Sequence, residues 1–226
     1  MPQLENTMKL EDYISNDLPT LNFNESVLDS KLKTKDQRVS HFPVTLNNKL
    51  YGSLPESDLQ TFSDDSKLIS EFQYTLEAFF ATEEDTILDL LTLFAVNETN
   101  ILPVLNSNKE YIGFYELNDI LNFYAETPFF NEDGIVLILE KDSATYSISE
   151  ITQISESNNA LILGLHVSFK NEKTSQVTIK IKTDIIDEII QSYRRYEYNV
   201  ISNHEDDSYL EDLKNRSNYL QRYLSI

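Results

Sequence analysis

The sequence contains no cysteine and few residues that interrupt regular structure. Without cysteine there is no disulfide, no thiolate metal site and no cysteine nucleophile. Only 4 glycines and 6 prolines occur among 226 residues, which excludes a low-complexity disordered chain. No apolar run reaches about 18 residues, the length typical of a membrane-spanning helix. The 40% of apolar residues are nevertheless enough to bury a core.

Basic residues are scarce as well. The chain has 18 basic and 38 acidic residues, a net charge of −20. Such a charge repels nucleic-acid phosphates and anionic lipids, so we expect neither a nucleic-acid partner nor a membrane partner. The first residues lack the basic and apolar regions of a signal peptide. The sequence therefore predicts an acidic, soluble, cytoplasmic protein.

What is present is an internal repeat. Residues 25–44 (ESVLDSKLKTKDQRVSHFPV) align without a gap with residues 85–104 (DTILDLLTLFAVNETNILPV), 60 positions later. The likeness continues at an offset of 61, where KLYG at 49–52 meets EYIG at 110–113. Each copy predicts a short lead-in strand and then helix, strand, turn, strand and helix. One copy is too small to close a core, so we expect the two to pack together.

The elements of the two copies can be placed from their patterns. The expected strands cover 42–46, 49–54, 101–105 and 111–115, with asparagine-rich turns between the members of each pair. Further helices begin near 56 and 117. The helix over 87–96 is apolar nearly all round, so we expect it to be buried on more than one side.

These motifs resemble a cystathionine-β-synthase (CBS) domain pair over about residues 8–125, with units at about 8–65 and 66–125. The resemblance implies clefts that hold adenosine-type ligands, with an adenine nucleotide as the candidate cofactor. The family pattern begins with a glycine and two apolar residues. A serine or threonine, two further residues and an aspartate then follow. The aspartate accepts hydrogen bonds from the ribose hydroxyls. The positions that the resemblance assigns to ligand binding are Asp58, Asp119, Gly52, Gly113, Phe42 and Leu102.

The sequence departs from that pattern at the hydroxyl position. Pro55 stands there in the first copy and Glu116 in the second. Proline offers no donor, and a glutamate repels phosphate. Residues 64–127 carry 2 basic and 13 acidic residues, which also disfavours a polyphosphate. Asp58 and Asp119 have an alternative role as caps of the helices that follow.

Residues 126–133 are expected to form a linker or a strand entry, and residues 134–203 predict the order βαββαβ. In the strand over 161–169, alternation would place Leu163, Leu165 and Val167 on one face and Ile162 and Gly164 on the other. The order predicts a ferredoxin-like fold and resembles an ACT domain, so the whole chain resembles the acetoin-utilisation family of CBS–ACT proteins. The expected fold class is therefore mixed α+β and α/β.

Two features of the second half bear on its role. The turn over 141–146 lacks the glycine that ACT effector sites use, which argues against an amino-acid effector there. The domain is expected to span 126–206, followed by a C-terminal helix over 207–226. That helix has a heptad-like spacing of leucines with Ser217 at its centre. Because Ser217 fills such a seam poorly and two heptads are too short to dimerise alone, we expect docking on its own chain over a coiled coil.

No catalytic or metal-binding constellation is found. The three histidines lack metal-ligand spacing, and no phosphate-binding or nucleophile motif occurs. The sequence therefore predicts a non-enzymatic, homodimeric regulatory protein that senses a small molecule or modulates a protein partner. The alternative is a ligand-free scaffold, in which Tyr51, Phe114 or Tyr115 would fill the cleft.

Overall fold

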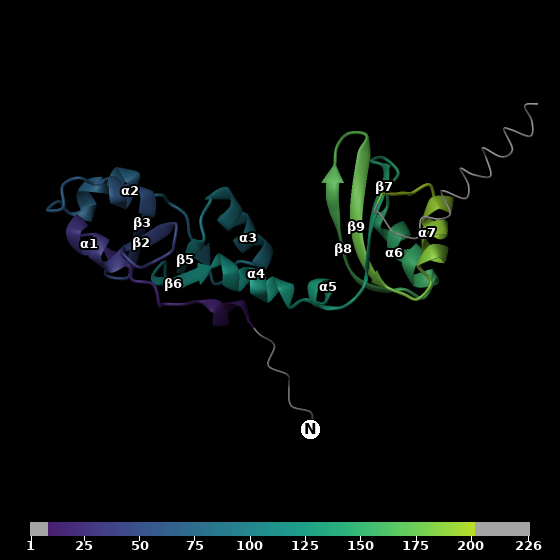
Figure 1. Ribbon diagram of the computed structural model, residues 1–226, viewed down its shortest axis with the longest axis horizontal. Coiled ribbons are helices and arrows are strands. Elements are labelled where there is room, and N and C mark those ends of the chain that lie inside the picture. Colours follow the sequence, from purple (N-terminus) through teal and green to yellow (C-terminus); the bar gives the residue numbers. More distant parts are fainter. Residues whose placement is uncertain (1–8, 202–226) are drawn as a thin grey trace, which may run out of the picture. The chain divides into compact units, whose positions relative to one another are not determined.

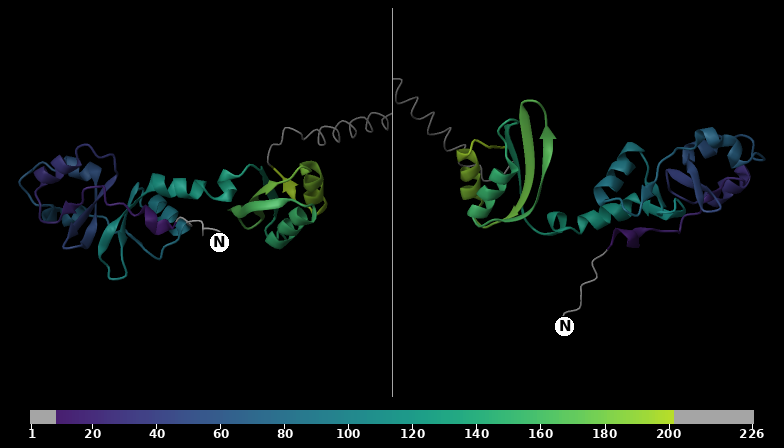
Figure 2. Two further views of the ribbon diagram at one scale, coloured as in Figure 1. Left: turned by 90° about the horizontal axis from the view of Figure 1, so that it is seen from below. Right: turned by 180° about the vertical axis from the view of Figure 1, so that it is seen from behind.

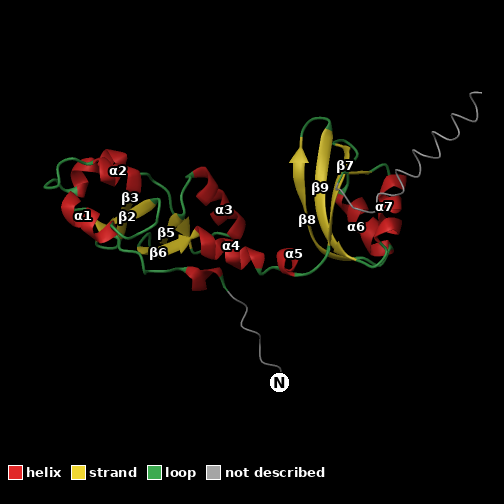
Figure 3. Cartoon of the chain, in the orientation of Figure 1, coloured by secondary structure: helices red, strands yellow, loops and turns green. Residues whose placement is uncertain are grey.

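The computed structural model describes residues 9–201. The chain divides into two compact units, residues 1–126 and residues 127–226. Both units combine helices with strands (Figure 3), so the predicted mixed fold class is confirmed. The predicted C-terminal helix over 207–226 lies outside the described residues.

The first repeat forms a three-stranded sheet with two helices (Figure 1). A single 3₁₀ turn, Leu10–Tyr13, precedes it. Its elements are β1 (Leu21–Asn22), α1 (Val27–Thr34), β2 (His41–Leu46), β3 (Lys49–Pro55) and α2 (Glu56–Thr61). Strand β1 pairs in parallel with β2, and β2 forms an antiparallel hairpin with β3. Asn47 and Asn48 make the hairpin turn with positive φ angles of 52° and 60°, which asparagine tolerates.

The second repeat has the same elements in the same order. After a 3₁₀ segment, Ile69–Thr75, come β4 (Ala81–Thr82), α3 (Ile87–Val96), β5 (Ile101–Leu105), β6 (Tyr111–Glu116) and α4 (Leu117–Ala125). Its sheet order β4-β5-β6 repeats the parallel and antiparallel pairings of β1-β2-β3. The bulges also correspond, at Val44/Thr45 and at Val104/Leu105. The predicted repeat is therefore confirmed at the level of strand register.

The cores of the two repeats share residues. Ile101 and Phe114, from the second repeat, lie in the core of the first. The second core is built around Leu90, Phe94 and Leu102. The core of the first repeat is therefore completed by residues of the second, which explains why the first copy does not suffice alone.

The expectation for helix α3 was wrong. Leu90 and Phe94 are buried, whereas Leu88 is 61% exposed and Val96 is 74% exposed. The helix therefore packs along one face only. The physical reason is that the rest of the second repeat packs on α3 from one side only. The sequence of a helix that is apolar nearly all round does not indicate which side that is.

The second unit is a four-stranded antiparallel sheet with two helices on one face (Figures 1 and 2). A short helix, α5 (Pro128–Asn131), comes first. Then follow β7 (Ile135–Asp142), α6 (Ile148–Ser157), β8 (Leu161–Lys170), β9 (Thr174–Lys182), α7 (Ile186–Arg195) and β10 (Asn199–Val200). The strand order β10-β7-β9-β8 is that of a ferredoxin-like βαββαβ fold, as predicted. The ACT type of this fold stays a prediction.

The predicted alternation along β8 was wrong. Register shifts between Ile162 and Gly164 and between Val167 and Phe169 interrupt it. Ile162 and Leu165 consequently both pack against the core. A bulge inserts an unpaired residue and so changes which face the following side chains point to. The predicted linker also contains the helix α5, and a Cβ at Gly164 would lie 2.5 Å from the ring of Phe129 in that helix.

Candidate functional site

A cleft of about 650 Å³ lies in the first unit where the two repeats meet. It is formed by the start of β2, the junction between β3 and α2, the segment before β4 and the end of α3. The lining residues are Ser40, His41, Pro55, Glu56, Ser57, Asp58, Glu77, Val96, Asn97 and Glu98. Both repeats therefore contribute to one concave surface, which is a common place for a ligand.

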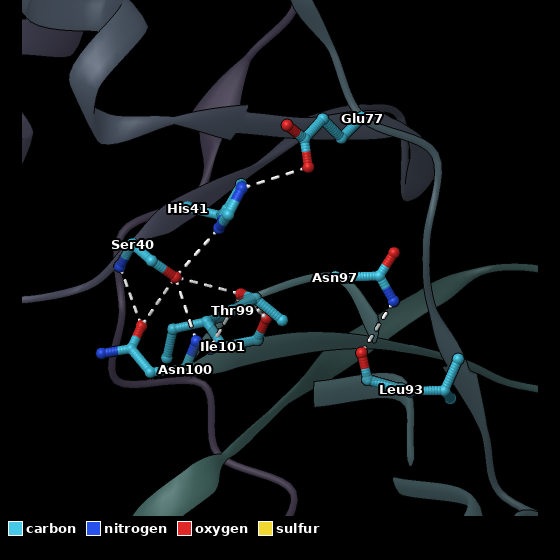
Figure 4. A network of polar contacts seen from close by, with 8 residues as sticks. All are labelled: Ser40, His41, Glu77, Leu93, Asn97, Thr99, Asn100 and Ile101. Carbon is cyan, nitrogen blue, oxygen red and sulfur yellow. Dashed lines mark hydrogen bonds and ion pairs between the residues drawn. The ribbon is translucent and has the colours of Figure 1, made fainter. Parts of the chain in front are cut away.

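Behind the cleft, a polar network joins the two repeats (Figure 4). Ser40 donates its backbone N–H to Asn100 Oδ1 at 2.8 Å and its hydroxyl to the same oxygen at 2.9 Å. The N–H of Asn100 donates in return to Ser40 Oγ at 3.0 Å. Ser40 and Asn100 occupy equivalent positions in the repeat, each directly before the first strand of its hairpin. The network therefore fixes the two β-hairpins to one another.

His41 extends this network to the cleft wall. Its Nδ1 lies 2.9 Å from Ser40 Oγ, and its Nε2 lies 3.2 Å from Glu77 Oε2. The His41 side chain is 9% exposed, and its ring meets the ring of Phe79 edge-on at 5.3 Å. Both ring nitrogens thus have partners, so His41 acts as a wall residue that connects the network to Glu77.

The charge of the lining is strongly negative. The lining contains no lysine or arginine but four carboxylates, those of Glu56, Asp58, Glu77 and Glu98. Of these carboxylates, Glu77 has His41 as a partner. A phosphate that entered would meet like charge at short range, where repulsion is strongest.

Asp58 is the one sequence-predicted site residue that lines this cleft. It lies in the first turn of α2, where no side chain makes a capping hydrogen bond, and the same holds for Asp119 in α4. The alternative role of these two residues as helix caps is therefore not what the structure shows. Within residues 9–201, no side-chain hydrogen bond to the Asp58 carboxylate is formed, so its oxygens can accept from a ligand.

The remaining predicted residues lie elsewhere. Phe42 and Leu102 are fully buried in the two cores. Gly52 and Gly113 adopt φ angles of +150° and +148° and allow a neighbouring segment to approach the sheet. A Cβ at Gly52 would lie 3.0 Å from the Glu77 carbonyl oxygen. Because these close approaches serve the packing of the fold, the role of the two glycines in ligand binding stays a prediction.

The aromatic side chains proposed to fill the cleft do not line it. Phe114 and Tyr115 are buried in the cores of the first and second repeats. Tyr51 packs against the first core and stacks on Phe23 at a ring-centroid distance of 4.1 Å. The residues that sequence reasoning missed are Ser40, Glu77 and Asn100. The equivalence of Ser40 and Asn100 in the repeat was a signal that could have found two of them.

The described residues form neither a metal centre nor a membrane-spanning helix. Between residues 9 and 201, no three histidine or carboxylate side chains converge as metal ligands. In that part of the chain, every helix is too short or too polar to cross a bilayer.

Comparison with known proteins finds a family match for part of the chain. Residues 69–126, which contain the second repeat, match the CBS domain family. A search of proteins with curated descriptions gave no significant match. The narrower resemblance to the acetoin-utilisation family stays a prediction.

Solved structures resemble about half of the chain at low identity. A CBS domain pair/ACT domain protein from Thermotoga maritima is 22% identical, with a TM-score of 0.47, and the match covers 53% of this chain and 98% of that one. The CBS domains of a transcriptional regulator from Streptococcus pneumoniae are 17% identical, with a TM-score of 0.45 and coverages of 52% and 99%. A CBSX2 structure in complex with AMP is 17% identical, with a TM-score of 0.43 and coverages of 52% and 96%. Values this low leave the function to be argued from the residues of this chain.

Proposed function

We propose that this chain is a non-enzymatic regulatory protein whose cleft at Asp58 binds an adenosine-type small molecule. In this proposal, a CBS domain pair spans residues 8–125, with units 8–65 and 66–125, and an ACT-type domain spans 126–206. The observation that carries the proposal is the Asp58 carboxylate, which stands without a side-chain partner on the wall of a cleft made by both repeats. The CBS match of residues 69–126 supports it.

The charge of the cleft narrows the ligand class. An ionised carboxylate can accept both hydroxyl protons of a ribose, which is the task we assign to Asp58. The other lining carboxylates and the proline at position 55 oppose a phosphate. Adenosine, or a cationic adenosyl compound such as S-adenosylmethionine, therefore fits the lining better than AMP or ATP.

Regulation follows from the position of the cleft between the repeats. A ligand that contacts the start of β2 and the end of α3 touches both repeats. It would favour whichever placement of the repeats it binds best, and so shift the population of states. The downstream target of that shift is proposed to be a protein partner.

Thermal unfolding of the full chain tests the ligand. A compound present at about 100 times its Kd raises the unfolding free energy by about 2.7 kcal/mol. We expect a rise in Tm with adenosine or S-adenosylmethionine, a weaker one with AMP or ATP, and loss of the response in Asp58→Asn. The variant Glu98→Gln removes one lining charge, so AMP should bind it more tightly than the native chain.

The control for these variants is Asp133→Asn, which removes one charge from an exposed position in the second unit. It should respond to every compound as the native chain does. A flat response of the native chain to the whole panel, with and without Mg²⁺, would overturn the sensor proposal. A ligand-free scaffold would then replace it, with the negative lining of the cleft, not the aromatic side chains first expected there, keeping nucleotides out.

A homodimer is the second part of the proposal, and uncovered apolar helix faces support it. Leu28 on α1 and Leu88 on α3 are 48% and 61% exposed and occupy equivalent positions in the repeat. Two copies related by a two-fold axis present the same surfaces to each other, so one pair of apolar helices can serve both sides of an interface.

Light scattering coupled to size exclusion measures the mass of the particle. We expect a dimer for the native chain and a shift toward monomer for the double variant Leu28→Glu/Leu88→Glu. Leu161→Glu places the same charge on an exposed leucine of β8 and should leave the mass unchanged. A monomeric native chain at 100 µM would contradict the dimer without bearing on the ligand.

A further inference from the structure

A second cavity, of about 220 Å³, lies in the second unit between α6 and α7. Its walls come from α6 and from the last turn of α7, on the helical side of the unit (Figure 1). The volume equals that of about seven liquid water molecules at roughly 30 Å³ each. The cavity is thus large enough for a ligand of amino-acid size, and it is separate from the cleft at Asp58.

One of the two charged groups on the wall, Glu150, already has a partner of opposite charge. Glu150 Oε2 accepts a hydrogen bond from Lys141 Nζ at 3.0 Å. The Lys141 side chain is 11% exposed, donates also to the Tyr196 carbonyl oxygen at 2.8 Å and lies 4.3 Å from the centre of the Tyr198 ring. The hydrogen bond from Lys141, followed by one from Tyr198, lowers the pKa of Glu150. Glu150 therefore stays ionised but paired.

The other charged group, Arg195, has no carboxylate partner. Its Nη2 donates to Ser192 Oγ at 2.8 Å, and none of the ion pairs found within residues 9–201 includes it. The residue is exposed, and its guanidinium has five N–H donors, so donors other than the one bound to Ser192 can serve a ligand at the cavity. In a chain of net charge −20, this wall carries an uncompensated positive charge.

The walls are fixed by hydrogen bonds of their own. Asn158 Nδ2 donates to the Ile154 carbonyl at 2.7 Å, and Ser192 Oγ donates to the Glu188 carbonyl at 2.8 Å. Beneath them, the buried Tyr193 hydroxyl donates to the Ile151 carbonyl at 3.1 Å. A cavity whose walls are held in place loses little conformational freedom when a ligand binds.

From these observations, we propose that the cavity between α6 and α7 binds a small organic carboxylate through the guanidinium of Arg195. A carboxylate accepts two parallel hydrogen bonds from a guanidinium, which gives both strength and orientation. Gln153 supplies a second amide donor on the wall, and Ile154 and Tyr196 supply apolar contact for the rest of the molecule.

Succinate is a suitable probe, and two-dimensional ¹H–¹⁵N spectra of the full chain are the readout. We expect the side-chain amide signals of Gln153 and Asn158 to shift in a saturable way as succinate is added. Arg195→Gln should weaken the fitted affinity at least tenfold. Arg195→Lys keeps the charge but loses the two parallel hydrogen bonds. Its affinity for succinate should therefore lie between those of the native chain and Arg195→Gln.

The control is Lys173→Gln, which removes one positive charge from the exposed turn before β9 and should bind succinate like the native chain. The unshifted signals of each variant show that it is folded. Shifts that do not saturate by 50 mM, that are matched by chloride at equal ionic strength, or that persist in Arg195→Gln each overturn the proposal. The adenosine response at Asp58 is independent of all these outcomes.

Discussion

Gly113→Ala is expected to destabilise the first unit by about 3 kcal/mol or more. Gly113 has a φ of +148°, which residues with a Cβ rarely adopt, and its Cβ would lie 2.6 Å from the Ser15 carbonyl oxygen and 2.7 Å from Ile14 Cγ2. Backbone strain of this kind costs about 1–3 kcal/mol, and overpacking costs a similar amount. The two effects act at one position and add.

The displaced atom also has a structural task. The Ser15 carbonyl accepts a hydrogen bond from the Phe114 N–H at 3.0 Å, and the Ser15 N–H donates to the Phe114 carbonyl at 2.9 Å. A Cβ at Gly113 would push residues 14–15 off β6 and break both bonds. Urea unfolding of the full chain, followed by circular dichroism, measures the loss. Hydrogen exchange over residues 110–117 locates it.

Two variants of β3 control for this interpretation. Gly52→Ala repeats the change in the first repeat, where the nearest atoms are at 2.9 and 3.0 Å, so its effect should be large but smaller. Ser53→Ala changes the next residue, whose buried hydroxyl has no hydrogen-bond partner in the described structure, and should be neutral or slightly stabilising. If the unfolding free energy of Gly113→Ala were within 0.5 kcal/mol of the native value, residues 14–15 would be shown to shift at little cost.

The repeat and most of its strands could be predicted because they depend on local patterns. Alternation and turn residues at 47–48 placed the hairpin of β2 and β3 within one residue of each end. The sequence Ser147-Ile148-Ser149-Glu150 has a pattern typical of a helix start, and the Ser147 side chain accepts a hydrogen bond from the Glu150 N–H. Such features need only neighbours in sequence.

What could not be predicted depends on residues far apart in sequence. Leu88 and Val96 are exposed because the second core packs only on the opposite face of α3. The bulges of β8 re-aim side chains that strict alternation would place on the other face. At the cleft, the aspartate pattern led to Asp58. His41 pairs with Glu77, 36 positions away, and Ser40 pairs with Asn100, 60 positions away. No pattern of neighbouring residues indicates partners at such separations.

Asn100→Ala is expected to lower the unfolding free energy of the first unit by about 2 kcal/mol, because it removes the acceptor shared by two donors of Ser40. Asn100 Oδ1 receives the Ser40 N–H at 2.8 Å and the Ser40 hydroxyl at 2.9 Å. A partly buried donor that loses its acceptor costs about 1–3 kcal/mol. The Ser40 hydroxyl can turn to Thr99 Oγ1, which is 3.0 Å away, but the backbone N–H cannot move.

The same bonds cross between the repeats, so their loss should have a second consequence. Ser40 also accepts from the Glu56 N–H at 2.8 Å through its carbonyl, which connects the network to the helix that carries Asp58. In Asn100→Ala we therefore expect weaker binding of the adenosine-type ligand as well as lower stability. A variant that lost stability but bound the ligand with native affinity would limit the network to a structural role.

Asn97→Ala is the matched control for the stability measurement, since it deletes the same amide group three residues earlier. Asn97 Nδ2 donates to the Leu93 carbonyl at 2.7 Å within its own helix end (Figure 4), so the deletion leaves the contact between the repeats intact. A double-mutant cycle of Ser40→Ala and Asn100→Ala isolates the coupling, which should be about 1–2 kcal/mol for residues that share hydrogen bonds. If the coupling is near zero, or if Asn97→Ala is as harmful as Asn100→Ala, the two hairpins are held together by their shared apolar cores alone.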